Sequence, residues 1–361
     1  MNDTLTVADP ATGVTAYPPR MTTDPGTPFP LGVTAASLMT LGPDVSLGAA
    51  QQAADLGYRS FWTAETTGFE AFSLLGAIGA TYPSLDLGTG VLALQLRTPA
   101  LVAMAGATLQ ALQPERRVML GIGISSPVVT QRWHGAPYGD RPLARVREFV
   151  TLVHLCLSGD KVDFAGDFYQ VKGFRLGVRL GDRKPEVVVG ALNPGMLRLA
   201  GEVADGVLLN YLPASHVPLS VAQVRDGEAA AGRPAGDVTT YAYVHAGVCE
   251  RADGVELARR DLFSYAVVDA YARNFERAGF ADEVAAIRAA HAEGDRAGAL
   301  AAVSDRMVDA IDVMGGADLV HETVRAYADA GADHPVLMPL PWGPDRRAVV
   351  ADTLRAAIGR G

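Results

Sequence analysis

The amino-acid sequence predicts an α/β fold, a (β/α)8 TIM barrel with one helical insertion. Short apolar runs rich in β-forming residues alternate with helical segments along most of the chain. Eight such runs are centred near Leu31, Phe61, Leu87, Met119, Val188, Leu208, Tyr243 and Leu337. Glycines and polar residues gather where several of these runs end, which is the side on which barrels carry their ligands.

Composition favours a small-molecule ligand. The chain has 361 residues, of which 49% are hydrophobic, and its 31 basic and 40 acidic residues give a net charge of -9. No cluster of Lys and Arg provides a surface for nucleic acid or an anionic membrane. The two cysteines, Cys156 and Cys249, lack metal-site or disulfide spacing. No apolar run is long enough to span a membrane and no signal sequence precedes the barrel, so we expect a cytoplasmic protein.

The N-terminal part divides into an arm and the start of the barrel. Residues 1–27 are rich in Pro, Thr, Asp and Gly without periodicity and are expected to form a flexible arm. The barrel then occupies residues 28–361. Asp44 is expected to cap the first helix, which ends at Gly57. The second strand ends in Glu65 and Thr66, polar residues at a position where a barrel keeps its chemistry.

The stretch from 85 to 126 contains a complete strand, helix and strand. Thr98 and Pro99 provide the N-cap and first residue of its helix. Gly90, Gly121 and Gly123 fall where the two strands end. A single glycine there is explained by a turn alone. Three glycines at the ends of neighbouring strands indicate a ligand site.

A long segment with large aromatic residues follows this unit. It contains Trp133, His134 and Tyr138 among glycines and prolines, on the side where barrels carry function. Such a loop can close over a ligand. We expect Trp133 to be packed rather than to touch a substrate. His134 is a candidate proton carrier without a visible partner.

The sequence NPGM after the fifth strand predicts an anion site. Asn193 takes the N-cap position and Pro194 the first helical position, so the backbone amides of Gly195 and Met196 point off the helix end. Gly190 gives the backbone room for a close approach. An ordinary capped helix without a ligand is the alternative interpretation.

The C-terminal third holds more helix than one barrel unit needs. Residues from about 253 to 314 form an Ala-rich, almost wholly helical pattern, which we interpret as an insertion with its own apolar face. That face and the early helices lead us to expect a homodimer.

Five motifs together resemble the luciferase-like flavin and deazaflavin oxidoreductases over nearly the whole chain from Leu31. They are LGTGV, RTPALVAMAGATLQAL, LGIGISSP, WHGAPYG and GALNPGMLRLAGEVADGVLLN. Within that superfamily, GALNPGMLRLAGEVADG and the closing region, from SDRMVDAIDVMGGADLV to LPWGPD, are most similar to enzymes that use coenzyme F420, especially the methylenetetrahydromethanopterin reductases. The FMN-dependent monooxygenase branch fits less well.

The resemblance implies hydride transfer with coenzyme F420, and reduction of a C=N or C=C bond suits such a cofactor. It matches Gly90-Val91 with the family's non-prolyl cis peptide beside the cofactor ring, and assigns the segment 190–196 to the cofactor's phosphate. The cofactor-binding residues that we predict are Thr66, Gly90, Val91, Gly121, Gly123, Ser125, Ser126, Gly190, Ala191, Asn193, Pro194, Gly195 and Met196. No metal is expected.

The chain departs from the reductase pattern at two strand ends. Thr34 stands where the reductases carry an acidic residue, and Glu65-Thr66 stands where they carry Asp-His. We therefore take Glu65 as the candidate proton donor and list Thr34 and Gln95 as further catalytic candidates. Two alternatives stay open: a two-component FMN monooxygenase, which would need oxygen, and a barrel that binds a cofactor without turnover.

Overall fold

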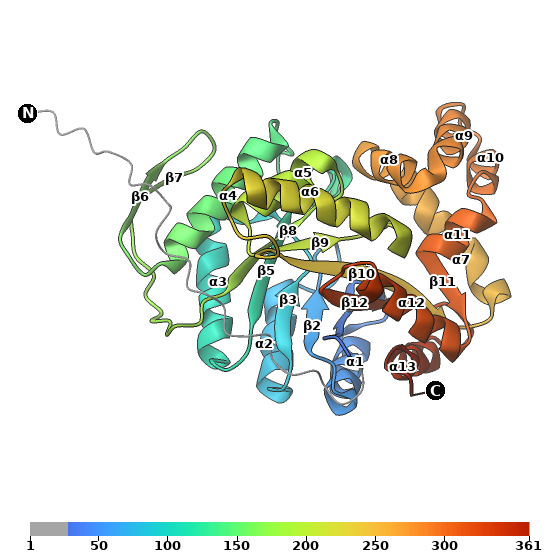
Figure 1. Cartoon of the computed structure of the whole chain (residues 1–361), viewed down its shortest axis with the longest axis horizontal. Helices are drawn as coiled ribbons and strands as arrows, with labels where there is room; N and C mark the ends of the chain where they lie inside the picture. Colours follow the sequence, from blue (N-terminus) through green and yellow to red (C-terminus); the bar gives the residue numbers. More distant parts are fainter. Residues whose placement is uncertain (1–27, 361) are drawn as a thin grey trace, which may run out of the picture.

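The structure is a computed structural model, and it describes residues 28–360 (Figure 1). The predicted N-terminal arm, residues 1–27, lies outside the described residues. None of the described helices combines the length and apolar character needed to cross a membrane.

Eight parallel strands form a closed ring, which confirms the predicted barrel. The strands pair in the order β1, β2, β3, β5, β8, β9, β10 and β12, and β12 pairs with β1. Their bounds are β1 Gly32–Thr34, β2 Ser60–Thr63, β3 Asp86–Thr89, β5 Val118–Gly123, β8 Glu186–Gly190, β9 Gly206–Leu209, β10 Thr239–Val248 and β12 His334–Pro339. All eight predicted strand positions fall in or next to these strands.

Eight helices surround the ring and cover the outward side chains of the strands. They are α1 Pro43–Leu56, α2 Ala71–Thr81, α3 Pro99–Leu112, α4 Pro142–Leu157, α5 Pro194–Val203, α6 Val217–Ala230, α12 Ala317–Asp329 and α13 Arg346–Ala357. The main apolar core lies between the helices and the strands. A smaller cluster fills the inside of the barrel, where the rings of Trp62 and Tyr241 meet edge to face with centroids 4.9 Å apart.

Helix ends follow local chemistry, with one correction. Helix α3 begins where the Thr98 side chain accepts a hydrogen bond of 3.3 Å from the amide of Leu101, as predicted. Helix α1 ends at Gly57, whose φ of 84° suits glycine. The prediction that Asp44 caps α1 is wrong, because Pro43 already occupies the first helical position and Gly42 is the N-cap.

Two additions extend the barrel at opposite ends of the molecule (Figure 1). The antiparallel strands β6 (Val162–Ala165) and β7 (Gln170–Phe174) form a hairpin. The other addition follows β10 and contains α7 (Arg251–Ala266), α8 (Asp269–Phe275), α9 (Ala281–Ala292), α10 (Arg296–Ala301) and α11 (Asp305–Ile311). We call residues 251–311 the helical segment.

The helical segment buries its apolar side chains in a cluster of its own, together with Tyr211 and Met314. It leads into β11 (Asp312–Gly315), a short strand that pairs in parallel with His245–Val248 of β10. We expected helix as far as residue 314, so the last residues of that range are a correction. Strand β10 spans ten residues, and its length leaves the C-terminal half free to pair with β11.

Two further short elements lie near the carboxyl ends of the strands. Strand β4 (Leu92–Ala93) continues β3 after an interruption and pairs with β5. The segment Val128–Trp133, labelled η3, is a helical turn of π type within the region that we expected to be a loop.

Candidate active site

A pocket of about 300 Å³ opens at the carboxyl ends of the barrel strands. It is lined by residues that follow six different strands, including Ser37 after β1, Thr66 after β2, Val91 after β3 and Ser125 after β5. Its volume lies at the lower end of the range for small-molecule sites, and its position is the usual one for barrels. The candidate active site is therefore on the predicted face.

The floor of the pocket contains the peptide between Gly90 and Val91, which is cis as expected. The amide of Gly90 donates to the carbonyl of Thr63 at 2.6 Å, and the Tyr243 hydroxyl donates to the carbonyl of Gly90 at 2.8 Å. A Cβ atom on Gly90 would lie 2.0 Å from the Tyr243 hydroxyl oxygen, so only glycine fits here. We call Gly90 and Val91 the platform.

Three of the predicted cofactor-binding glycines support the platform from behind. A Cβ atom on Gly121 would lie 1.8 Å from the carbonyl oxygen of Thr89. A Cβ atom on Gly123 would lie 2.8 Å, and one on Gly190 3.1 Å, from methyl carbons of Val91. The room that we assigned at Gly190 to a phosphate is thus taken by Val91. These glycines serve the site by letting the platform approach two strands.

Thr34 lies beneath the pocket. It is fully buried, its hydroxyl accepts from the amide of Ala36 at 3.1 Å, and it donates to the Tyr243 hydroxyl at 3.3 Å. Burial raises the pKa of Tyr243, which keeps this phenol neutral and able to donate to Gly90. Thr34 therefore positions Tyr243 rather than facing a substrate.

Glu65 lines the pocket, but its oxygens already have partners. Arg97 donates to both oxygens, at 2.5 and 3.3 Å, and the amide of Ala71 donates to one of them at 3.0 Å. Arg97 also pairs with Glu70, the N-cap of α2. This geometry favours a role for Glu65 in holding α2 and Arg97 in place, and it does not favour Glu65 as the proton donor.

Gln95 lies outside the pocket lining and holds the segment after β5. Its side-chain nitrogen donates to the carbonyls of Ile124 at 3.0 Å and Tyr138 at 3.2 Å. Ser126 starts the π-type turn, because its hydroxyl accepts from the amide of Val129 at 3.3 Å. Of the two predicted serines, Ser125 alone lines the pocket, with a φ of 52°.

The aromatic segment does not behave as we expected at Trp133. This side chain is 55% exposed and does not line the pocket, so the expectation of a packed residue is wrong. The physical reason is that residues 131–135 are all exposed, so no neighbouring element covers this end of η3. His134 does have a partner, since its Nε2 atom lies within hydrogen-bond distance of the carbonyl of Thr66. That contact ties the segment to the second strand end.

The predicted anion site is smaller than the sequence indicated. Asn193 is the N-cap of α5, but the amide of Met196 donates to the carbonyl of Asn193 at 2.9 Å. Pro194 has no N–H, and Ala191 is buried with its amide bonded to Leu208. Among these described residues, the amide of Gly195 is left as the candidate donor at the helix end.

A positive charge that the sequence did not reveal lies beside this helix end. Arg277 of the helical segment donates to the side-chain oxygen of Asn193 and, at 3.3 Å, to the carbonyl of Leu192. Burial and the nearby charge of Arg273 lower the pKa of Arg277, and the charge of Glu276 opposes them. An anion at this helix end would meet an amide, a helix dipole and the guanidinium group of Arg277.

The opposite wall of the pocket comes from residues that the sequence reasoning missed. Tyr211 packs against Tyr265 of α7, with ring centroids 4.0 Å apart, and against Tyr271 of α8. His245 and Asp261 line the same wall. The alternation of Tyr241, Tyr243 and His245 along one strand was the available signal, whereas nothing in the sequence placed α7 over the barrel mouth.

Fold and site together define a TIM barrel with a small-molecule site at the carboxyl ends of its strands. The luciferase-like monooxygenase family model matches residues 32–334. The chain therefore belongs to the luciferase-like monooxygenase family.

Named relatives are similar to this chain in sequence, and solved structures are similar to it in fold. The 5,10-methylenetetrahydromethanopterin reductase of Archaeoglobus fulgidus is 29% identical, over 82% of this chain and 89% of that protein. An F420-dependent glucose-6-phosphate dehydrogenase of Nakamurella multipartita is 32% identical over 46% of this chain and 50% of that protein. The structure of coenzyme F420-dependent tetrahydromethanopterin reductase from Methanopyrus kandleri has a TM-score of 0.72 at 20% identity, covering 91% of this chain and 97% of that chain.

Proposed function

We propose that this protein is a coenzyme F420-dependent oxidoreductase that transfers a hydride between the cofactor and a small organic substrate. Reduction of a C=N or C=C bond is the reaction that we favour. Relatives that cover most of the chain are named as methylenetetrahydromethanopterin reductases, and others carry F420 in their names. The platform at the pocket floor is the observation that carries the proposal.

The residues present fit a deazaflavin with a phosphate. Val91 lines the pocket with an apolar side chain. A side chain in place of Gly121, Gly123 or Gly190 would crowd Val91 or the backbone of Thr89. The amide of Gly195 and the guanidinium of Arg277 would hold the phosphate. Thr66 and Ser125 line the pocket near the platform and would meet the polar edge of the ring.

When bound, the deazaflavin supplies a carbon that carries or accepts a hydride. The chain's own residues orient the partner of that carbon and keep water away. Met338, Leu340 and Trp342 provide an apolar wall next to the tyrosines. Such a wall excludes water and holds the reacting carbons close together. The pocket of about 300 Å³ is lined both by the platform and by the tyrosine wall, so the cofactor's ring and the reacting part of the substrate would share it.

Cofactor titration tests this proposal. The purified protein is titrated with F420, FMN and NADPH, and binding is followed by fluorescence and by the shift in melting temperature. We expect F420 to bind at least ~10-fold more tightly than FMN, a difference of about 1.4 kcal/mol. An Arg277→Gln variant tests the phosphate contact separately. It should weaken F420 binding, because it removes the charge beside the phosphate, while leaving the platform intact.

The same titration distinguishes the alternatives. Tighter binding of FMN, together with substrate-dependent oxygen consumption, would favour the two-component monooxygenase. Tight F420 binding without oxidation or reduction of any imine or enone would favour the barrel without turnover. Failure to bind either flavin would contradict the proposal.

A further inference from the structure

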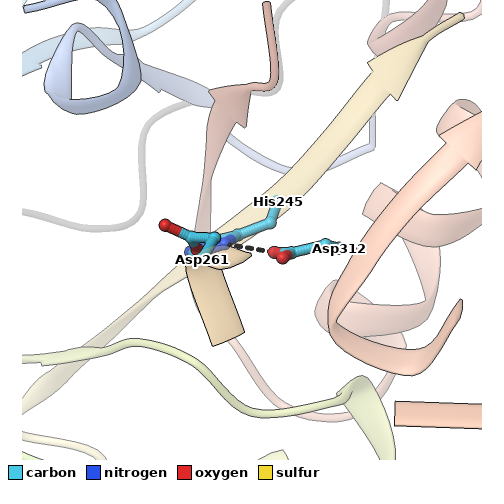
Figure 2. Close-up of side chains that lie close together, drawn as sticks. All are labelled: His245, Asp261 and Asp312. Atoms are coloured by element: carbon cyan, nitrogen blue, oxygen red, sulfur yellow. Dashed lines mark hydrogen bonds and ion pairs between the residues drawn. The ribbon is translucent and has the colours of Figure 1, made fainter. Parts of the chain in front are cut away.

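Three titratable side chains meet at one wall of the pocket. His245 comes from β10, Asp261 from α7 and Asp312 from β11, and their ligand atoms all lie within 4.8 Å of one another (Figure 2). His245 and Asp261 line the pocket, whereas Asp312 is fully buried behind them. These residues are far apart in sequence, and the function proposed above does not yet use them.

The hydrogen bonds fix where one proton lies. The Oδ1 atom of Asn210 accepts from the amide of Tyr211 at 2.9 Å, and it lies 2.8 Å from Nε2 of His245. A backbone amide can only donate, so the Asn210 atom that faces both groups is its oxygen. The Nε2 atom of His245 must therefore carry a hydrogen and donate it to Asn210.

A second proton lies on the other side of the ring. The Nδ1 atom of His245 is 2.9 Å from Oδ1 of Asp312 (Figure 2). This contact is a hydrogen bond only if one of the two atoms carries a hydrogen. The pair is then either an imidazolium beside a carboxylate or a neutral ring beside a carboxylic acid. In both forms, His245 and Asp312 together hold one proton more than a neutral histidine and an ionised aspartate would hold together.

The two hydrogen bonds of the His245 ring argue against a bound cation at the cluster. A metal ion needs a ring nitrogen with a free lone pair, and both nitrogens of His245 already have partners. The Oδ2 atom of Asp312 is buried without a hydrogen-bond partner among the described residues. A buried oxygen of this kind is less costly when the carboxyl group shares a proton.

Asp261 is the member of the cluster that is partly exposed in the pocket. The Tyr211 hydroxyl donates to its Oδ2 atom at 2.8 Å. Burial raises the pKa of Asp261 to about 7, the charge of Asp312 acts in the same direction, and His245 opposes both. Tyr265 and Tyr271 face the same space, and burial raises their pKa values above the usual phenol value, so they stay neutral. Asp261 thus changes charge near neutral pH.

We propose that Asp261 is a catalytic acid-base residue that exchanges a proton with the substrate in this pocket, and that His245 and Asp312 are positioning residues that hold a second proton behind it. This inference rests on the proposed hydride transfer. In the reduction of a C=N bond, the carbon accepts the hydride, the π electrons move to nitrogen, and nitrogen takes the proton from Asp261. Asp261 becomes a carboxylate and regains its proton from solvent. Oxidation runs the same steps in reverse.

The first test needs no substrate. Melting temperatures of the apo protein are measured from pH 5 to 8 for the wild type, Asp261→Asn and Asp253→Asn, the last being a control at an exposed aspartate of the same helix. An aspartate with a raised pKa in the folded state stabilises the fold below its unfolded pKa, and this contribution is lost as the pH rises through about 7. The wild type and the control should lose stability over this range relative to Asp261→Asn. Parallel curves for all three would overturn the inference.

The second test uses reduced F420 with 1-pyrroline as a C=N probe and 2-cyclohexen-1-one as a C=C probe. Asp261→Asn should lower kcat/KM by about 100-fold or more while leaving F420 affinity unchanged. The wild-type rate should fall above about pH 7, and Asp312→Asn should move that limb of the profile without abolishing turnover.

The outcomes separate the two proposals. If the wild type does not bind F420, the proposed function is wrong. If the wild type reduces a probe and Asp261→Asn does so within ~3-fold with the same pH profile, this inference is wrong. If neither probe is reduced, the melting curves still decide whether Asp261 carries the proton. Tight binding of Zn²⁺ or Mn²⁺ that disappears in His245→Gln would also overturn it.

Discussion

Gly195 offers a single-residue test of the phosphate position. A Cβ atom there would lie 3.3 Å from Leu143, an exposed side chain that can shift. Gly195→Asp and Gly195→Asn have the same shape and differ in charge. Repulsion between two charges ~4 Å apart is about 1 to 4 kcal/mol at a protein surface, so Asp should weaken F420 binding by roughly ten-fold to several hundred-fold relative to Asn. Fluorescence titration measures this ratio, and a ratio within ~2-fold would place the phosphate elsewhere.

The support of the platform is tested at Gly121. Alanine there would bring its Cβ to 1.8 Å from the carbonyl oxygen of Thr89, which belongs to backbone and cannot turn away. We expect Gly121→Ala to cost about 1 to 3 kcal/mol or more in folding free energy and to abolish cofactor binding. Gly48→Ala is the control, because its Cβ meets nothing within 4 Å inside α1 and should stabilise by about 0.5 to 1 kcal/mol. Denaturant unfolding compares the two, and equal effects would remove the steric explanation.

At the scale of single residues, the sequence predicted the position of the site more accurately than the role of each residue in it. The glycines at strand ends were recognisable, but their neighbours come from other strands, so the sequence did not show that Gly190 makes room for Val91. Glu65 was predicted to be the proton donor because the sequence did not show that Arg97 pairs with it. Arg97 lies 32 positions away, and its pairing with Glu65 depends on how α2 and α3 pack.

At the scale of elements, an ion pair near the amino ends of the strands joins β5, β8 and β10. Arg117 donates to Glu186 at 2.7 Å and to the Tyr241 hydroxyl at 2.8 Å. Burial raises the pKa of Glu186 in spite of Arg117. We expect Arg117→Met to cost about 3 to 5 kcal/mol, because it leaves a buried carboxylate unpaired. A raised pKa favours the protonated folded form, so the cost should be largest near pH 8 and shrink toward pH 4.

The matching control is Arg355→Met, which removes an exposed pair with Asp352. Both partners there are about half exposed, so the loss should stay below about 1 kcal/mol at every pH. Urea unfolding at several pH values measures both variants. A pH-independent cost for Arg117→Met would show that lost packing, and not the buried charge, dominates.

Elements with a clear period were predictable, and elements defined by distant partners were not. The eight strands and their helices follow from apolar periodicity. Strand β11 does not, because four residues after a helical run form a strand only where β10 extends far enough to pair with them. The tyrosines of the pocket wall were missed for a similar reason, since α7 is held by apolar contacts with helices that follow much later in the chain.

At the scale of the whole molecule, the predicted homodimer remains a prediction, and the structure changes the expected contact surface. The helical segment buries its apolar face within itself. Among the described residues, α3 instead exposes a stripe of Leu101, Met104 and Leu112, with exposed fractions of 47%, 48% and 70%. We expect this stripe to meet a second copy. Light scattering should give a dimer for the wild type and a monomer for Leu101→Glu with Met104→Glu; a wild-type monomer at micromolar concentration would contradict it.

Strand β10 pairs with three neighbours, β9, β12 and β11, along its ten residues. It carries Tyr241 beside Arg117, Tyr243 beneath the platform and His245 in the pocket wall. A strand paired on both sides opens only in large-scale unfolding, so its amide protons should be among the slowest to exchange with deuterium. The part of the pocket wall that carries His245 would then open only when the barrel itself unfolds.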